Sequence, residues 1–123
     1  MSLLISTAHR AARNQASITL AGAASTLRFY TAEGGTLLAT RTLANPAGTI
    51  NAQGRIVLSA SAADLVAETG SVTWAEWWDS AGSVMAAGTV TDQAGAGDFK
   101  LAGTAGTTIY QGGRVLLDDV ILG

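Results

Sequence analysis

Hydrophobic and polar residues alternate in short runs along most of the chain after residue 22. In residues 26–31, Leu27 and Phe29 alternate with Arg28 and Tyr30, which is the two-residue period of a half-buried β-strand. Comparable runs, separated by Gly, Asn, Asp and Pro, lie at 36–43, 55–59, 71–79, 83–90, 98–101, 107–110 and 114–122. This spacing predicts an antiparallel β-sandwich of seven to nine strands, jelly-roll or immunoglobulin-like.

Two of these runs need a further interpretation. The run at 36–43 is expected to end at Asn45-Pro46, because proline has no N–H to donate to a sheet. In the last run the apolar residues change parity, and a bulge at Asp118-Asp119 would place all of them on the core side: Val115, Leu117, Val120 and Leu122.

The first 22 residues follow the pattern of a short helix. Ser6 or Thr7 is suited to cap its start and Gly22 to end it, with the helix over about Ala8–Leu20. Its expected apolar stripe is formed by Ala8, Ala11, Ala12 and Ala16, with Arg10, Arg13 and Asn14 off it. We therefore predict one mainly β domain over residues 1–123, with 1–22 as an N-terminal helical arm and 23–123 as the sandwich.

All three tryptophans lie in one predicted hairpin, at positions 74, 77 and 78. Asp79 and Gly82 suit the first and fourth positions of its turn. Alternation then places Trp77 with Ala75 on one face, which we assign to the core. The other face carries Trp74, Glu76 and Trp78.

The second face of this strand is the candidate binding surface. Arg28 and Tyr30 alternate on their strand as Glu76 and Trp78 do on theirs, so neighbouring strands would put an Arg28/Glu76 pair beside a Tyr30/Trp78 pair. Trp74 completes the set. Such a face can lie under the N-terminal helix, contact a partner subunit or stack a sugar ring, and the residues leave these alternatives open.

Composition and charge exclude several partners. Only 13% of the residues are charged and the net charge is -2, which does not provide the basic surface that nucleic acid requires. No apolar run approaches the roughly 20 residues of a membrane helix, and residues 1–5 lack the basic start of a secretory signal. A surface this poor in charge is easier to understand if much of it is buried in an assembly. We expect a homo-oligomer made in the cytoplasm without an export signal.

The sequence offers little material for catalysis or cofactor binding. It has no cysteine and a single histidine, His9, with no Gly-x-Ser-x-Gly turn to hold a nucleophile. The acidic pairs Asp92/Asp98 and Asp118-Asp119 lack the spacing of a calcium loop, and Glu76 has no second carboxylate placed for glycoside hydrolysis. We predict a non-enzymatic protein without metal or cofactor.

Across nearly its whole length the chain resembles small structural proteins encoded in the virion gene regions of tailed phages and prophages. The resemblance rests on the order of five segments: Ser6–Arg13, Leu27–Thr31, Leu37–Ala47, Trp78–Val90 and Gly113–Ile121. It implies a virion-associated β-sandwich without enzymatic activity, an oligomeric building or decoration unit of the head, collar or tail that contacts itself and other virion proteins. The alternative is a module of a tail fibre or appendage that binds a host-surface glycan through Tyr30, Trp74 and Trp78.

Overall fold

The computed structural model describes residues 4–61, 65–102, 106–115, 117 and 120–122. Its helix, α1, spans Thr7–Ala21 and follows Ser6, whose Oγ accepts a hydrogen bond from the His9 N–H at 3.1 Å. This bond satisfies one of the free N–H groups at the start of the helix. Gly22, at φ 76°, ends it. The predicted helix is therefore confirmed to within one residue at each end.

The buried face of α1 differs from the predicted alanine stripe. Ala8, Ala12 and Ala16 are exposed, whereas the buried residues are Asn14, Ile18 and Ala21. Asn14 donates through Nδ2 to the Gly54 carbonyl at 2.7 Å, and this bond offsets the cost of burying an amide. The helix thus docks partly through a polar contact, which apolar periodicity cannot reveal.

Gly54 allows the close approach of α1 to the turn that follows the second strand. Its φ is 77°, and a Cβ at this position would lie 2.6 Å from the Thr7 carbonyl oxygen. Glycine is therefore required here both for its backbone conformation and for space.

Nine strands follow the helix in the described part of the chain, in keeping with the seven to nine predicted: β1 (Thr26–Tyr30), β2 (Leu37–Ile50), β3 (Ile56–Ala60), β4 (Gly70–Ser71), β5 (Trp74–Trp78), β6 (Val84–Asp92), β7 (Phe99–Leu101), β8 (Thr108–Ile109) and β9 (Ile121–Leu122).

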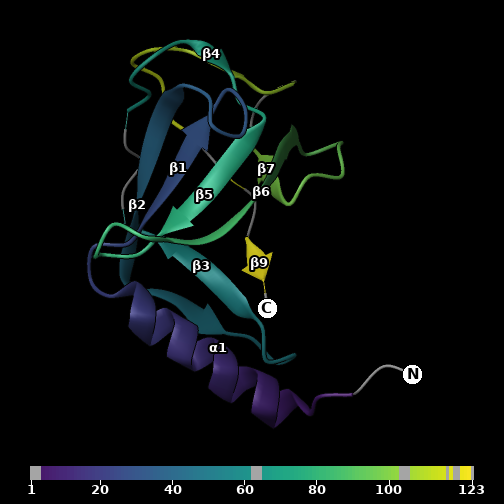
Figure 1. The fold of residues 1–123 in the computed structure, drawn as a ribbon. Helices are drawn as coiled ribbons and strands as arrows, with labels where there is room; N and C mark the ends of the chain where they lie inside the picture. The colour runs from purple at the N-terminus through teal and green to yellow at the C-terminus, as the bar shows by residue number, and fades with distance from the viewer. Residues whose placement is uncertain (1–3, 62–64, 103–105, 116, 118–119, 123) are drawn as a thin grey trace.

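The strands form one large sheet and one small one. Seven of them lie in the order β7-β6-β5-β1-β2-β3-β9, and β4 pairs with β8. All neighbours in the large sheet are antiparallel except β6 and β7, which are parallel. The large sheet curls into a half-barrel, with β4 at one end and α1 at the other (Figure 1). The mainly β content and the single helix are as predicted, but a mixed, curled sheet replaces the two antiparallel layers expected of a sandwich.

The second strand does not end at Asn45-Pro46 as predicted. β2 continues to Ile50, pairing first with β1 and then with β3. Its register against β3 shifts between Leu43 and Gly48, so Pro46 lies in a bulged stretch. No backbone N–H is needed there for a ladder hydrogen bond, and proline is therefore tolerated. The peptide bond before Pro46 is cis.

The core lies inside the curl, and Trp77, Phe29 and Leu27 are among its largest fully buried side chains. Trp77 donates through Nε1 to the Oγ of Ser25 at 2.6 Å, and Ser25 donates to the Trp78 carbonyl at 2.7 Å. The buried indole and hydroxyl are therefore both hydrogen-bonded. The prediction that Trp77 belongs to the core is confirmed.

The last predicted strand is much shorter than expected. Among the described residues of 114–122, Ile121–Leu122 form a strand, β9, beside β3, while Arg114 and Leu117 form isolated bridges. The four residues predicted to face the core nevertheless pack on it: Val115, Leu117, Val120 and Leu122. The predicted bulge at 118–119 lies outside the described residues. In the described part of the chain, no helix combines the length and the apolar character needed to cross a bilayer.

The turn of the β5–β6 hairpin is attached to the end of α1. Its backbone follows the prediction, with Gly82 at φ 88° and the Gly82 N–H donating to the Asp79 carbonyl at 3.3 Å. Ser80 donates to the Ala21 carbonyl twice, from its backbone N–H and from Oγ, each at 2.9 Å. Its Oγ also accepts from the Ala24 N–H at 2.8 Å. The hairpin and the helix are thereby held together at one point.

Candidate functional site

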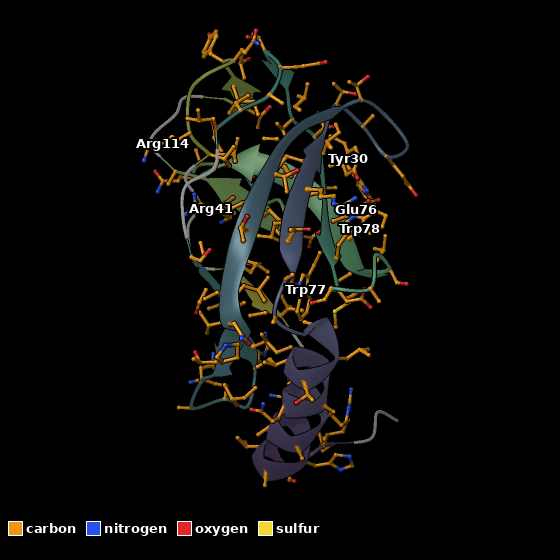
Figure 2. The ribbon with its side chains drawn as sticks, turned by 90° about the vertical axis from the view of Figure 1, so that its left-hand side faces the viewer. Tyr30, Arg41, Glu76, Trp77, Trp78 and Arg114 are labelled. Atoms are coloured by element: carbon orange, nitrogen blue, oxygen red, sulfur yellow. The ribbon has the colours of Figure 1, made fainter. Side chains whose placement is uncertain are left out.

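The five predicted surface residues come together on the face of the sheet turned away from the core. β1 and β5 are antiparallel neighbours, with Arg28 opposite Glu76 and Tyr30 opposite Trp74. The Arg28/Glu76 pair is as predicted. The predicted Tyr30/Trp78 pair is wrong, because antiparallel order brings Trp74 opposite Tyr30 and moves Trp78 to the other side of Glu76. We call Arg28, Tyr30, Trp74, Glu76 and Trp78 the aromatic face; Figure 2 labels Tyr30, Glu76 and Trp78.

Glu76 holds the two outer indoles. Trp74 donates through Nε1 to its Oε2 at 3.2 Å, and Trp78 donates through Nε1 to its Oε1 at 3.1 Å. The geometry follows from the strand, since residues two apart point to the same face and lie about 7 Å apart. A carboxylate between two indoles can therefore reach both. Each carboxylate oxygen receives one N–H, and both rings are fixed with their polar edges turned inward.

Arg28 covers one ring of the aromatic face. Its guanidinium carbon lies 4.1 Å from the centre of the Trp78 ring, within the range of a cation–π contact, which contributes about 0.5–1 kcal/mol at exposed sites and more when water is excluded. Trp78 is therefore held by a carboxylate at its edge and by a cation on its face.

Tyr30 completes the aromatic face as a neutral phenol. Burial raises the pKa of its hydroxyl above 10.0, the negative charge of Glu76 raises it further, and the positive charge of Arg28 opposes the shift. The hydroxyl therefore stays protonated at neutral pH and can donate a hydrogen bond.

The surroundings decide one of the alternatives left open by the sequence. α1 packs against β2 and β3, and all five residues of the aromatic face remain half-buried. Figure 2 shows α1 beyond one end of the strands that carry the face. The N-terminal helix therefore does not cover it.

Two exposed aliphatic residues extend the aromatic face at its margins: Leu37 opposite Tyr30, 39% exposed, and Val84 opposite Trp78, 47% exposed.

The other residues considered for chemistry lie apart from the aromatic face. His9 is exposed on α1. Asp92 organises a loop by accepting hydrogen bonds from the N–H groups of Gly106 at 2.8 Å and of Ala94 and Gly95 at 3.1 Å. Among the described residues, no group of three or more His, Cys, Asp or Glu is placed to hold a metal ion. Asp118 and Asp119 lie outside the described residues.

Arg41 is a residue that the sequence interpretation missed. It lies opposite Leu27 on the core side of β2 and donates from a guanidinium nitrogen to the Val115 carbonyl at 2.6 Å. It lines a cavity of about 140 Å³ together with Leu43, Leu58 and Val120, among others. The signal was present, because Arg41 has the same parity as Ala39 and Leu43 on their strand.

A comparison of the chain with protein-family models, with curated proteins and with solved structures found no match.

Proposed function

We propose that this chain is a non-enzymatic structural protein that acts by protein–protein contact, and that the aromatic face is its contact surface. The observation that carries the proposal is the arrangement around Glu76. Both indole N–H groups are hydrogen-bonded within the face, while both rings stay half-exposed. A partner can cover these rings without leaving an indole N–H unsatisfied, which removes a common cost of burying tryptophan.

The composition of the aromatic face supports the same conclusion. Tryptophan, tyrosine and arginine are the residues that most often dominate the energy of protein interfaces, and here they lie together between exposed aliphatic residues. The charge-poor surface of the chain also favours burial in an assembly. A stable contact would bury about 800 Å² on each partner, with the two indoles near its centre.

Within this proposal, the partner is a second copy of the chain and the assembly is a phage virion. The resemblance in sequence supports this context and suggests a building or decoration unit of the head, collar or tail, made in the host cytoplasm.

Two measurements test the proposal. The mass of the purified chain, measured by light scattering over a dilution series, should be that of an oligomer, and the protein should be found in purified particles. A Trp74→Ala/Trp78→Ala variant should weaken the oligomer by about ten-fold or more. Tyr110→Ala is the matched control, because Tyr110 is an aromatic residue 66% exposed outside the aromatic face. A monomeric wild type that is absent from particles would refute the proposal.

One observation favours a second function, the binding of a host-surface glycan. Tyr30 and Trp74 lie opposite each other with half-exposed rings, and Arg28 and Glu76 offer polar groups beside them. Aromatic rings next to such groups can stack and orient a sugar. A titration of tryptophan fluorescence with host polysaccharide tests this function, and an unchanged spectrum at saturating polysaccharide would exclude it.

A further inference from the structure

The two edges of the large sheet leave a groove in the half-barrel. The groove has a volume of about 180 Å³, with Ala86, Ala87 and Phe99 on the wall formed by β6 and β7, and Val120, Ile121 and Leu122 on the wall that ends in β9. The walls are mostly small or aliphatic. For comparison, an apolar cavity of about 150 Å³ can hold a molecule of benzene, so one or two aliphatic side chains fit here.

Backbone groups of both walls point into this groove. The Val90 N–H donates to the Thr73 carbonyl at 3.0 Å, so the alternation of an antiparallel ladder turns the N–H and C=O of Ala87 away from β5. On the opposite wall, the Leu58 N–H donates to the Val120 carbonyl at 3.0 Å. The same alternation turns the N–H and C=O of Ile121 away from β3. The groove thus has a strand edge on each side, which is the arrangement that accepts an added strand.

Asp98 limits the length of this acceptor edge. Its carboxylate accepts a hydrogen bond from the Thr89 N–H at 3.1 Å, so the next edge position of β6 after Ala87 is already occupied. Only a short segment can add here, and an apolar one fits the walls.

The chain carries such a segment immediately before α1. Leu4 is 94% exposed and Ile5 is 38% exposed, and Ser6 has an extended backbone with φ -63° and ψ 153°. From here on, the word arm refers only to Leu4–Ser6 and no longer to the whole predicted N-terminal segment. The arm leads away from the body of the molecule (Figure 1). The Leu4 side chain is therefore almost entirely without the burial that an apolar side chain favours.

We propose that the arm of a second copy enters this groove as an added strand between β6 and β9. The position of the arm favours a reciprocal exchange. Thr7, where α1 starts, contacts Gly54 in the turn before β3, and Leu122 pairs with Ile56 at the start of β3. The arm therefore begins near the β9 wall of its own groove. In a two-fold pair with facing grooves, each arm can cross to the other copy, as in strand exchange between identical chains.

This contact adjoins the aromatic face at one point, because Ala87 lies opposite Glu76, but it does not use the two outer indoles. Its side chains come from the arm and from the two edges of the sheet, and the indoles that surround Glu76 take no part. Either contact can exist without the other, and each has its own variants.

Site-directed cross-linking tests the proposal directly, because the natural chain has no cysteine. A Leu4→Cys chain is mixed with an affinity-tagged Ala87→Cys chain under mild oxidation. We expect a disulfide-linked tagged–untagged dimer in about ten-fold higher yield than with a tagged Glu33→Cys chain, since Glu33 is exposed in the turn between β1 and β2. Equal yields from the two tagged chains would overturn the proposal. So would a Leu4→Cys/Ala87→Cys chain that closes its disulfide internally, because that result would place the arm in its own groove.

A second measurement needs no cysteine. A Leu4→Ser/Ile5→Ser variant should weaken self-association by about ten-fold or more, because it removes two aliphatic side chains from the contact. Leu20→Ser is the matched control, since Leu20 is 67% exposed on α1 and should leave association unchanged. Equal association by the arm variant and the wild type would overturn the proposal. Repeating the cross-linking in Trp74→Ala/Trp78→Ala chains separates the two contacts, since the arm cross-link should persist when the aromatic face is removed.

Discussion

Replacing Glu76 by glutamine should release the two outer indoles while keeping the shape of the side chain. A glutamine has one acceptor oxygen and one NH₂ group, so it can accept from only one of the Nε1 groups of Trp74 and Trp78, which lie 3.2 and 3.1 Å from the carboxylate. The other indole N–H then faces a second donor. The negative charge beside Arg28 is also lost.

The expected size of this effect follows from the two bonds. Hydrogen bonds to charged groups contribute about 1.5–3 kcal/mol each when buried, and partial exposure of this face reduces that figure. We therefore expect Glu76→Gln to lower the free energy of unfolding by about 1–2 kcal/mol, which for a chain of this size lowers the melting temperature by about 4–8 °C.

Urea unfolding of the wild type and of Glu76→Gln, followed by circular dichroism, measures the change. Glu68→Gln is the control, because it removes an exposed carboxylate at another place. A double-mutant cycle with Trp74→Phe, which keeps a ring and removes the N–H, should give a coupling energy of about 0.5–1.5 kcal/mol. If Glu76→Gln is as stable as Glu68→Gln, or if the coupling energy is zero, the carboxylate does not hold the indoles and the basis of the contact surface is wrong.

Three further outcomes are expected. Asn14→Ala should lower the free energy of unfolding by about 1–2 kcal/mol in urea, because the Gly54 carbonyl loses its buried partner; no change would mean that α1 docks without this bond. Trp77→Phe should lower the free energy of unfolding by about 1–3 kcal/mol in the same assay, because the core loses side-chain volume and a hydrogen bond. The loss of stability is at the lower end of this range if neighbouring side chains move in to fill the space. The hydrogen bond from the Gly106 N–H is the main reason that the pKa of Asp92 lies below 3.8. The stability that Asp92 contributes is therefore complete above pH 3.8, and it is lost as the pH falls through the lower pKa of the folded state. Hydrogen exchange at Gly106 should accordingly quicken in Asp92→Asn at neutral pH, and an unchanged rate would show that the loop is held elsewhere.

Local alternation was enough to predict which side chains of two strands lie on the outer face of the sheet. Arg28, Tyr30, Trp74, Glu76 and Trp78 each have the parity of an outer position, and parity depends only on the strand that carries the residue. The same holds for the ends of α1, because Ser6 and Gly22 act within a few residues of themselves.

Features that depend on distant parts of the chain were not predictable from these patterns. The position of Trp74 opposite Tyr30 requires the direction of pairing between two strands that are far apart in sequence. β2 passes Pro46 because a bulge, placed by the partner strand, leaves that position without a ladder bond. The sequence pattern predicts Asn14 to be a surface residue, because its burial depends on contact with the distant turn at Gly54. Curling of one sheet in place of a two-layer sandwich is likewise a property of the whole strand order.

Ser80 makes two hydrogen bonds to Ala21 at the end of α1 and one to Ala24 just after it, and these bonds have a mechanical consequence. A helix of 15 residues is a stiff rod of about 22 Å, with the arm at one end and the tryptophan hairpin fastened to the other. Tension on the arm from a neighbouring copy would reach that hairpin along α1. Ser80→Ala would loosen the fastening, and hydrogen exchange in β5 would then become insensitive to occupation of the arm. Strain at an occupied arm would thus be felt at the hairpin that carries part of the aromatic face.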